Sequence, residues 1–216
     1  MRYVWVVLVV AGAAFAQGLT LDQVEAAVED TFDAIDDATV ELVLIDAASG
    51  DSIDLRAIFL PPDLARVEFV APFYLEDQFI VLDGELTYTY LPVTDQVLRQ
   101  ARAESEQLGG LFAAFGGDAD QVFDRDQNEV TLLGFEALED QPTYLIDFQL
   151  KRPESSLVGF QLWVADGEWL PLQFQGYDAE GKVTATIRFS NWQLNTGLDP
   201  EDVRALPPGA AVVDQE

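Results

Sequence analysis

The residue types that most often carry chemistry in proteins are missing from this chain. Its 216 residues include no histidine and no cysteine. This removes the commonest general base, the thiol nucleophile and most ligands of transition metals. Carboxylate chemistry remains, because Asp and Glu together number 39. With so many acids, two of them meet by chance, so the acids alone do not predict an enzyme.

Two local motifs resemble ligand-binding loops, and each fails at a required position. The run that starts at Asp124 begins like a calcium loop, but Glu129 stands where glycine is needed and Phe135 where the last ligand is needed. We interpret it as a solvated acidic turn. The glycines at 109–110 and 116–117 are not followed by the lysine of a phosphate loop. The sequence therefore predicts no metal ion, no cofactor and no catalytic residue.

The N-terminus reads as an export signal. Arg2 precedes an apolar run over residues 3–11, and Ala14 and Ala16 supply the small residues that a signal peptidase requires. We therefore expect a signal peptide over 1–16, cleaved after Ala16, and one mature domain over 17–216. An uncleaved anchor is the alternative, although the apolar run is too short to span a membrane. The sequence predicts a soluble periplasmic protein without a lipid anchor, since no cysteine follows Ala16.

The charge of the chain is strongly acidic. Lys and Arg number 11 against the 39 acids, which gives a formal net charge of -28 at pH 7. Nucleic acid and anionic lipid head groups are poor partners for such a chain, because phosphate binding needs clustered basic residues. Solubility through self-repulsion explains the charge, and a basic partner protein is the alternative. We expect a monomer.

Helical patterns open the mature chain and return in its middle. Thr20 is a good N-cap, and apolar residues then recur at helical spacing. Further short helices are expected over 103–115, 118–123 and 200–204. The apolar stripe of the opening helix comprises Leu21, Val24, Ala27, Val28, Phe32 and Ile35.

The rest of the chain reads as strands joined by turns. Asp83-Gly84, Asp166-Gly167 and Glu180-Gly181 are turn signals between neighbouring strands. No alternation of strands and helices occurs, so the sequence predicts a mainly β, α+β fold built on a strongly curved antiparallel sheet with helices on one side. The expected strands cover 38–47, 52–60, 64–70, 78–82, 85–91, 96–99, 129–135, 143–150, 157–165, 169–176 and 182–194.

One apolar face on every strand makes a surface that a single helix covers only in part. A curved sheet can wrap around this surface and leave an interior cavity for an apolar ligand. The same large side chains can instead fill the interior as an ordinary core. The expected inward residues are Phe59, Phe69, Tyr88, Tyr90, Phe148, Phe160, Leu162, Phe174, Ile187 and Phe189.

The glycine-flanked middle segment has the composition of a lid. Leu111, Phe112 and Phe115 lie between the two glycine pairs, and glycine permits the backbone rotation of a hinge. We add these three residues to the expected cargo-binding set. The alternative is an ordinary connection whose phenylalanines plug the core.

An ordered series of motifs resembles the periplasmic carriers of outer-membrane lipoproteins, the LolA-like family. The resemblance covers essentially the whole mature chain, although each motif alone is loose. Its parts are Pro72, the strand 78–82, Asp83-Gly84, the aromatic strand 86–91, Pro92, Gln96-Val97 and the terminal Pro207-Pro208-Gly209.

The resemblance implies an incomplete, highly curved antiparallel barrel whose helices form a lid over an apolar cavity. It also implies a carrier that takes lipoprotein acyl chains from an inner-membrane exporter to an outer-membrane acceptor, without enzyme chemistry. Two departures stand out. The family's latching basic residue has no counterpart immediately before Pro61, and the first basic residue after Pro61 is Arg66. Val203 and Ala205 stand where the family tends to have phenylalanine.

Three functional hypotheses follow. The first is a carrier of lipid or lipoprotein acyl chains. The second is an envelope-sensing or structural β module with a filled core that binds a protein partner. The third is a carboxylate-dependent hydrolase of envelope polymers.

Overall fold

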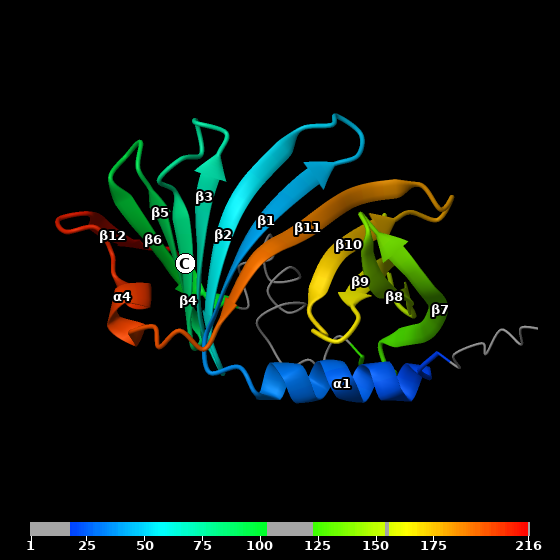
Figure 1. Ribbon diagram of the computed structural model, residues 1–216. Coiled ribbons are helices and arrows are strands. Elements are labelled where there is room, and N and C mark those ends of the chain that lie inside the picture. Colours follow the sequence, from blue (N-terminus) through cyan, green and yellow to red (C-terminus); the bar gives the residue numbers. More distant parts are fainter. Residues whose placement is uncertain (1–17, 103–122, 154–155, 216) are drawn as a thin grey trace, which may run out of the picture.

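The computed structural model describes residues 18–102, 123–153 and 156–215, and strands dominate it (Figure 1). Every predicted strand is present, with β7 longer than expected. The bounds are α1 (Leu21–Asp33), β1 (Ala38–Asp46), β2 (Ser52–Leu60), β3 (Leu64–Ala71), β4 (Phe79–Asp83), β5 (Leu86–Leu91), β6 (Gln96–Ala101), β7 (Asn128–Leu138), β8 (Gln141–Leu150), β9 (Gly159–Ala165), β10 (Pro171–Tyr177), β11 (Val183–Leu194), α4 (Pro200–Arg204) and β12 (Ala211–Asp214).

All strands join one 12-stranded sheet in the order β12-β6-β5-β4-β3-β2-β1-β11-β10-β9-β8-β7. Strands β1 to β6 form one meander and β7 to β11 another, and the pairing of β1 with β11 joins them. The sheet curls from one meander to the other without closing, because β12 and β7 stand at its two edges (Figure 1). The expectation of a mainly β, strongly curved, incomplete barrel is confirmed.

The C-terminal strand departs from the predicted pattern. No strand is predicted after residue 194 and the predicted sheet is antiparallel, but β12 pairs in parallel with β6, Val212 lying opposite Val97. Arg99 of β6 forms an ion pair with Asp214 of β12 at 2.6 Å. The short apolar run of β12 carries no signal of its own, since its partner strand lies more than a hundred positions away in the chain.

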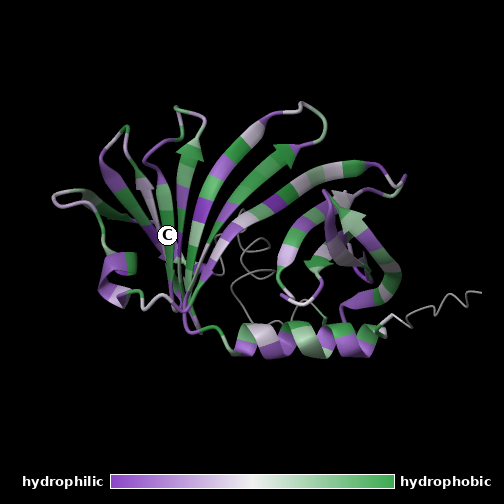
Figure 2. Cartoon of the chain, viewed as in Figure 1, coloured by the Kyte–Doolittle hydropathy of each residue, from purple (hydrophilic) through white to green (hydrophobic). Residues whose placement is uncertain are grey.

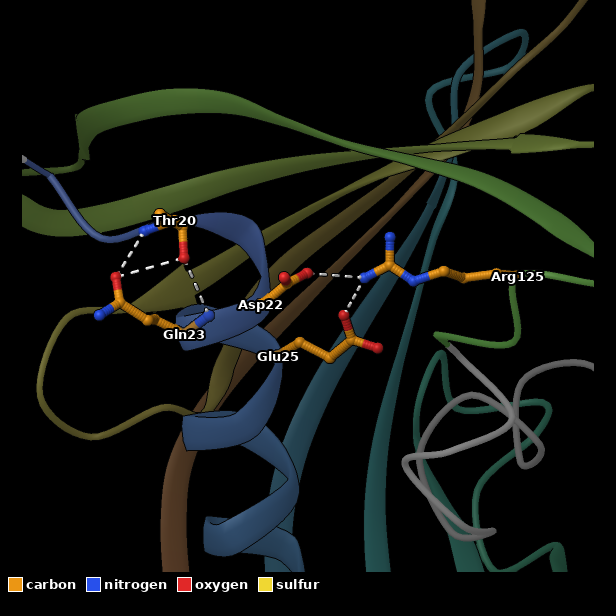
Figure 3. A network of polar contacts seen from close by, with 5 residues as sticks. All are labelled: Thr20, Asp22, Gln23, Glu25 and Arg125. Carbon is orange, nitrogen blue, oxygen red and sulfur yellow. Dashed lines mark hydrogen bonds and ion pairs between the residues drawn. The ribbon is translucent and has the colours of Figure 1, made fainter.

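Helix α1 begins as the sequence predicts. The Thr20 side chain accepts a hydrogen bond from the Gln23 backbone, and the Gln23 side chain accepts one from the Thr20 backbone, which forms a capping box. Arg125, just before β7, makes ion pairs with Asp22 and Glu25 of the same helix (Figure 3). The start of α1 is thereby tied to the second meander.

The sheet has two differently covered faces. Neighbouring residues of β2 show this, because Phe59 packs in a cluster with Ile35, at the end of α1, while Ile58 packs in a cluster with Val203 of α4. We call the face that carries Phe59 the inner face and the face that carries Ile58 the outer face. Along β2 and β11 the hydropathy alternates accordingly (Figure 2).

Helix α4 is held on the outer face by two arginines. Arg66 of β3 donates a hydrogen bond of 2.8 Å to the Ala205 carbonyl, at the end of the helix, and its guanidinium lies 3.7 Å from the ring centroid of Phe79. Arg204 pairs with Asp83 at 3.0 Å. The first basic residue after Pro61 therefore fastens α4 to the outer face.

Asp37 joins the two ends of the domain. Its buried carboxylate accepts hydrogen bonds from the backbone of Thr196, Gly197 and Leu198 and from the Thr196 hydroxyl. Burial by itself raises the pKa of Asp37, but these hydrogen bonds outweigh it and hold the pKa below its usual value. The start of β1 is thereby fixed to the chain that leaves β11 for α4.

Several expectations fall outside the described residues. They are the signal peptide over 1–16 and the helices over 103–115 and 118–123, of which Phe123 alone is described. Neither of the two helices bounded above is long and apolar enough to cross a membrane.

Candidate functional site

The inner face carries a continuous apolar surface. Two clusters of buried residues line it, one centred on β1, β2, β3 and β11 and the other on β8, β9 and α1. Phe174 of β10 packs against both clusters and makes them one surface. The structure brings together here the predicted residues Phe59, Phe69, Phe148, Phe160, Leu162, Phe174, Ile187 and Phe189.

A row of phenylalanine rings crosses the second meander on this face. The centroids of Phe148 and Phe160 are 4.5 Å apart with an interplanar angle of 12°, and those of Phe160 and Phe174 are 4.9 Å apart at 27°. Phe123 extends the row, its centroid lying 5.5 Å from that of Phe148. The strand register explains the row, because Phe148 lies opposite Phe160 on adjacent strands.

Exposure changes along the inner face. Leu42, Leu55 and Val67 are buried, whereas Leu44 and Ile53 are only partly buried. The last two lie opposite each other next to the β1–β2 turn. Ile35, which follows α1, packs at the opposite end of the same strands, against the cluster that contains Phe59. The apolar face is therefore partly exposed next to the β1–β2 turn.

Two predicted inward residues lie on the other face. Tyr88 is opposite Val81 and Tyr90 opposite Phe79, and all four belong to the cluster that contains Val203 of α4. The tyrosines are outer-face residues, which corrects the expectation. Apolar residues occupy both faces of β4, so alternation alone does not show which face of this hairpin is inward.

Leu111, Phe112 and Phe115, the residues of the predicted lid, lie outside the described residues. One residue just beyond them was not among the predicted site residues. Phe123 is buried in the ring row, although sequence reasoning placed it at the end of a short helix. Its isolation from other strand residues leaves no periodic signal by which to assign it.

The acidic run is a turn, as the sequence predicts. The Asp124 carboxylate accepts hydrogen bonds from the Asp126 backbone at 2.8 Å and from the Gln127 side chain at 2.9 Å. These bonds hold the pKa of Asp124 below its usual value. Within the described ranges, no group of three acidic side chains is arranged to hold a metal ion. What the inner face offers a ligand is apolar contact.

Solved structures of other proteins share the fold of this chain. The chain is 19% identical to an uncharacterized conserved protein from Thermus thermophilus, with a TM-score of 0.67 over 90% of this chain and 98% of that one. A putative outer membrane lipoprotein-sorting protein domain from Vibrio parahaemolyticus is 14% identical, with a TM-score of 0.50 over 84% and 95%. The predicted LolA-like fold is thereby confirmed.

A third similar structure is the Pseudomonas aeruginosa MucA/MucB complex, 13% identical with a TM-score of 0.51 over 83% of this chain and 61% of that chain. No curated protein matches. A family model described as a predicted periplasmic protein, DUF2092, matches residues 87–214, more than half of the chain. This description confirms the expected periplasmic location. The chain therefore belongs to this family of periplasmic proteins.

Proposed function

We propose that this protein is a periplasmic carrier that binds the acyl chains of lipids or lipoproteins on its inner face and moves them between the two membranes. The observation that carries the proposal is the continuous apolar surface that is partly exposed at Leu44 and Ile53. Burial of each CH₂ group contributes about 0.8 kcal/mol, so even part of an acyl chain binds firmly there. The binding needs no chemical step, which agrees with the lack of histidine and cysteine.

The test uses two neighbouring residues of β1. Leu44 is on the inner face and Val43 on the outer face, both partly buried in the same strand. We expect delipidated protein to bind a fluorescent C16 fatty acid and a synthetic triacylated lipopeptide. Leu44→Ser weakens this binding, whereas Val43→Ser, matched in position and polarity, leaves it unchanged. Equal binding by both variants, or no binding by the unaltered protein, contradicts the proposal.

Transport requires handover as well as binding. Radiolabelled lipopeptide loaded on the carrier is expected to pass to outer-membrane vesicles from the source cell and not to protein-free vesicles of the same lipids. Retention of the lipopeptide in both mixtures leaves a lipid-binding protein and refutes the carrier role.

A second function, docking to a protein partner, is favoured by exposed apolar residues at two strand connections. Phe73 and Tyr74, after β3, are 84% and 68% exposed, and Val93, after β5, is 91% exposed. Asp77 and Asp95 follow in the same connections, which contain no basic residue. This combination suits a partner with a basic, partly apolar surface, and MucB is a fold neighbour that is solved in a complex with a protein, MucA.

The two functions separate experimentally. Replacing Phe73 and Tyr74 with serine removes the exposed rings without touching the inner face. In an acyl carrier, the C16 fatty acid binds the double variant as it binds the unaltered protein. If the variant loses acyl binding, the exposed rings belong to the cargo site and not to a separate docking surface.

A further inference from the structure

A pocket of about 410 Å³ borders the inner-face core, because Ile35 of the cluster that contains Phe59 is one of its lining residues. The second half of α1 forms one wall, Trp169 in the β9–β10 turn another, and Leu194 at the end of β11 a third. This volume is within the range of small-molecule sites in proteins. The pocket therefore has room for a small organic group.

The floor of the pocket is apolar, and the hydroxyl and amide groups of its lining are already engaged. Ala27 and Ala34 of the α1 segment line it together with Leu194. The Asn195 amide donates to the Ala34 carbonyl at 3.0 Å, and the Thr31 hydroxyl donates to the Ala27 carbonyl at 2.8 Å. These two donors are therefore not available to a ligand.

Asp30 is the one charged residue of the lining. It is exposed on α1, and within the described ranges its carboxylate makes no hydrogen bond or ion pair. No lysine or arginine lines the pocket. The local charge is thus negative on a chain whose net charge is -28, and a cation is favoured at this place.

Trp169, in the pocket wall, has an unusual backbone conformation. Its φ is 58°, a left-handed value that a bulky residue rarely adopts. Its backbone amide donates to the Ala165 carbonyl at 3.0 Å, and its ring stacks on Tyr144 with the centroids 5.5 Å apart. In the part of the chain that is described, no second ring or cation stacks on the indole. Such strain persists where surrounding contacts keep a side chain in place for a function.

From the coincidence of an aromatic wall, one carboxylate and an apolar floor, we propose that this pocket binds an alkylammonium group. The indole of Trp169 attracts the cation through its ring, and the Asp30 carboxylate supplies the opposite charge. The apolar part of the ligand lies against Ala27, Ala34 and Leu194. The strongly acidic chain favours a basic protein as the source of this group, so the ligand is a lysine side chain of a protein partner.

The test reads the indole N–H signals of the full chain by NMR. The indoles of Trp163 and Trp192 donate to Glu136 at 2.7 Å and to the Pro171 carbonyl at 3.1 Å, so they serve as internal references. The Trp169 signal is assigned from a Trp169→Phe variant. Titration with butyltrimethylammonium or butylammonium is expected to shift this signal saturably and to leave the references unmoved. Tighter binding of butylammonium supports the lysine side chain, whereas tighter binding of butyltrimethylammonium contradicts it and indicates a lipid head group.

Two controls decide whether the charge matters. The neutral isostere 3,3-dimethylbutanol is expected to give no saturable shift. Asp30→Asn is expected to weaken cation binding about five-fold, while Asp33→Asn, an equal change of charge on an exposed residue of the same helix outside the lining, leaves it unchanged. The proposal is overturned if the alcohol binds as tightly as the cations, if both variants have equal effects, or if neither cation binds.

Discussion

The Tyr177 hydroxyl donates a hydrogen bond of 3.0 Å to the Asp147 carboxylate, and its ring passes directly over Gly159. The two residues lie on β10 and β8, with β9 between them. A side-chain bond thus spans three strands of the second meander. Burial, with a further contribution from this hydrogen bond and the Asp147 charge, raises the pKa of Tyr177 to about 12.

The raised pKa predicts an alkaline loss of stability. An unfolded tyrosine titrates near pH 10, so between about pH 10 and 12 the folded state binds more protons than the unfolded state. The contribution of Tyr177 is therefore complete below pH 10 and is lost as the pH rises through 12. We expect Tyr177→Phe to cost about 1 kcal/mol at pH 8 and to flatten the decline above pH 10. Urea unfolding of both proteins at several pH values measures this, and an unchanged alkaline slope contradicts it.

Gly159 is required by the same arrangement. A Cβ there would lie 2.3 Å from the Tyr177 hydroxyl and 2.6 Å from the Phe148 carbonyl, which is backbone and cannot move aside. We expect Gly159→Ala to lower the free energy of unfolding by about 1–3 kcal/mol. Gly18→Ala is the control, because nothing lies within 4 Å of its Cβ position. Equal denaturation midpoints for Gly159→Ala and Gly18→Ala would show that the contact at Gly159 is not tight.

Asp37 makes stability sensitive to acid. Its folded pKa lies below the ordinary value of 3.8, so its contribution is present above that pH and is lost as the pH falls through the folded pKa. Asp37→Asn is expected to lower the melting temperature at pH 7 and to reduce the loss of stability below pH 4. Asp36→Asn changes the same charge at an exposed neighbour and is expected to do neither. Calorimetry at pH 7 and pH 3 separates them, and identical profiles argue against the carboxylate's role.

Arg66 is predicted to keep α4 on the sheet. Its side chain is 13% exposed and bonds the carbonyls of Val203 and Ala205, so Arg66→Gln is expected to cost about 2 kcal/mol. The same substitution is expected to speed proteolytic cleavage in the segment that follows residue 198 and contains α4. Arg56→Gln is the matched control, since Arg56 and Arg66 both make ion pairs with Glu68, at 3.7 Å and 2.8 Å, but the Arg56 side chain is 49% exposed. Mass spectrometry of the digests detects the cleavage, and equal rates for both variants would refute the role of Arg66.

The positions of the elements follow largely from local sequence. Thr20 with Gln23 sets the start of α1, Asp83-Gly84 closes the β4–β5 hairpin, and Pro200 lies in the first turn of α4. These signals act over a few residues. Each one satisfies backbone hydrogen-bonding groups or favours a turn by itself, so its effect does not depend on contacts with distant parts of the chain. The alternation along β2 and β11 likewise predicted the inner face correctly at Phe59, Ile187 and Phe189.

Features that depend on distant partners emerge only in the folded chain. Tyr88 and Tyr90 have the pattern of inward residues, but α4, more than a hundred positions away, covers their face of the hairpin. Phe123 has no periodic neighbours and joins the ring row because it meets Phe148 in space. A strand with apolar residues on both sides has two equivalent orientations until another element covers one of them. Local sequence is thus enough to define every strand except β12, and packing between distant segments selects which side of each strand becomes the interior.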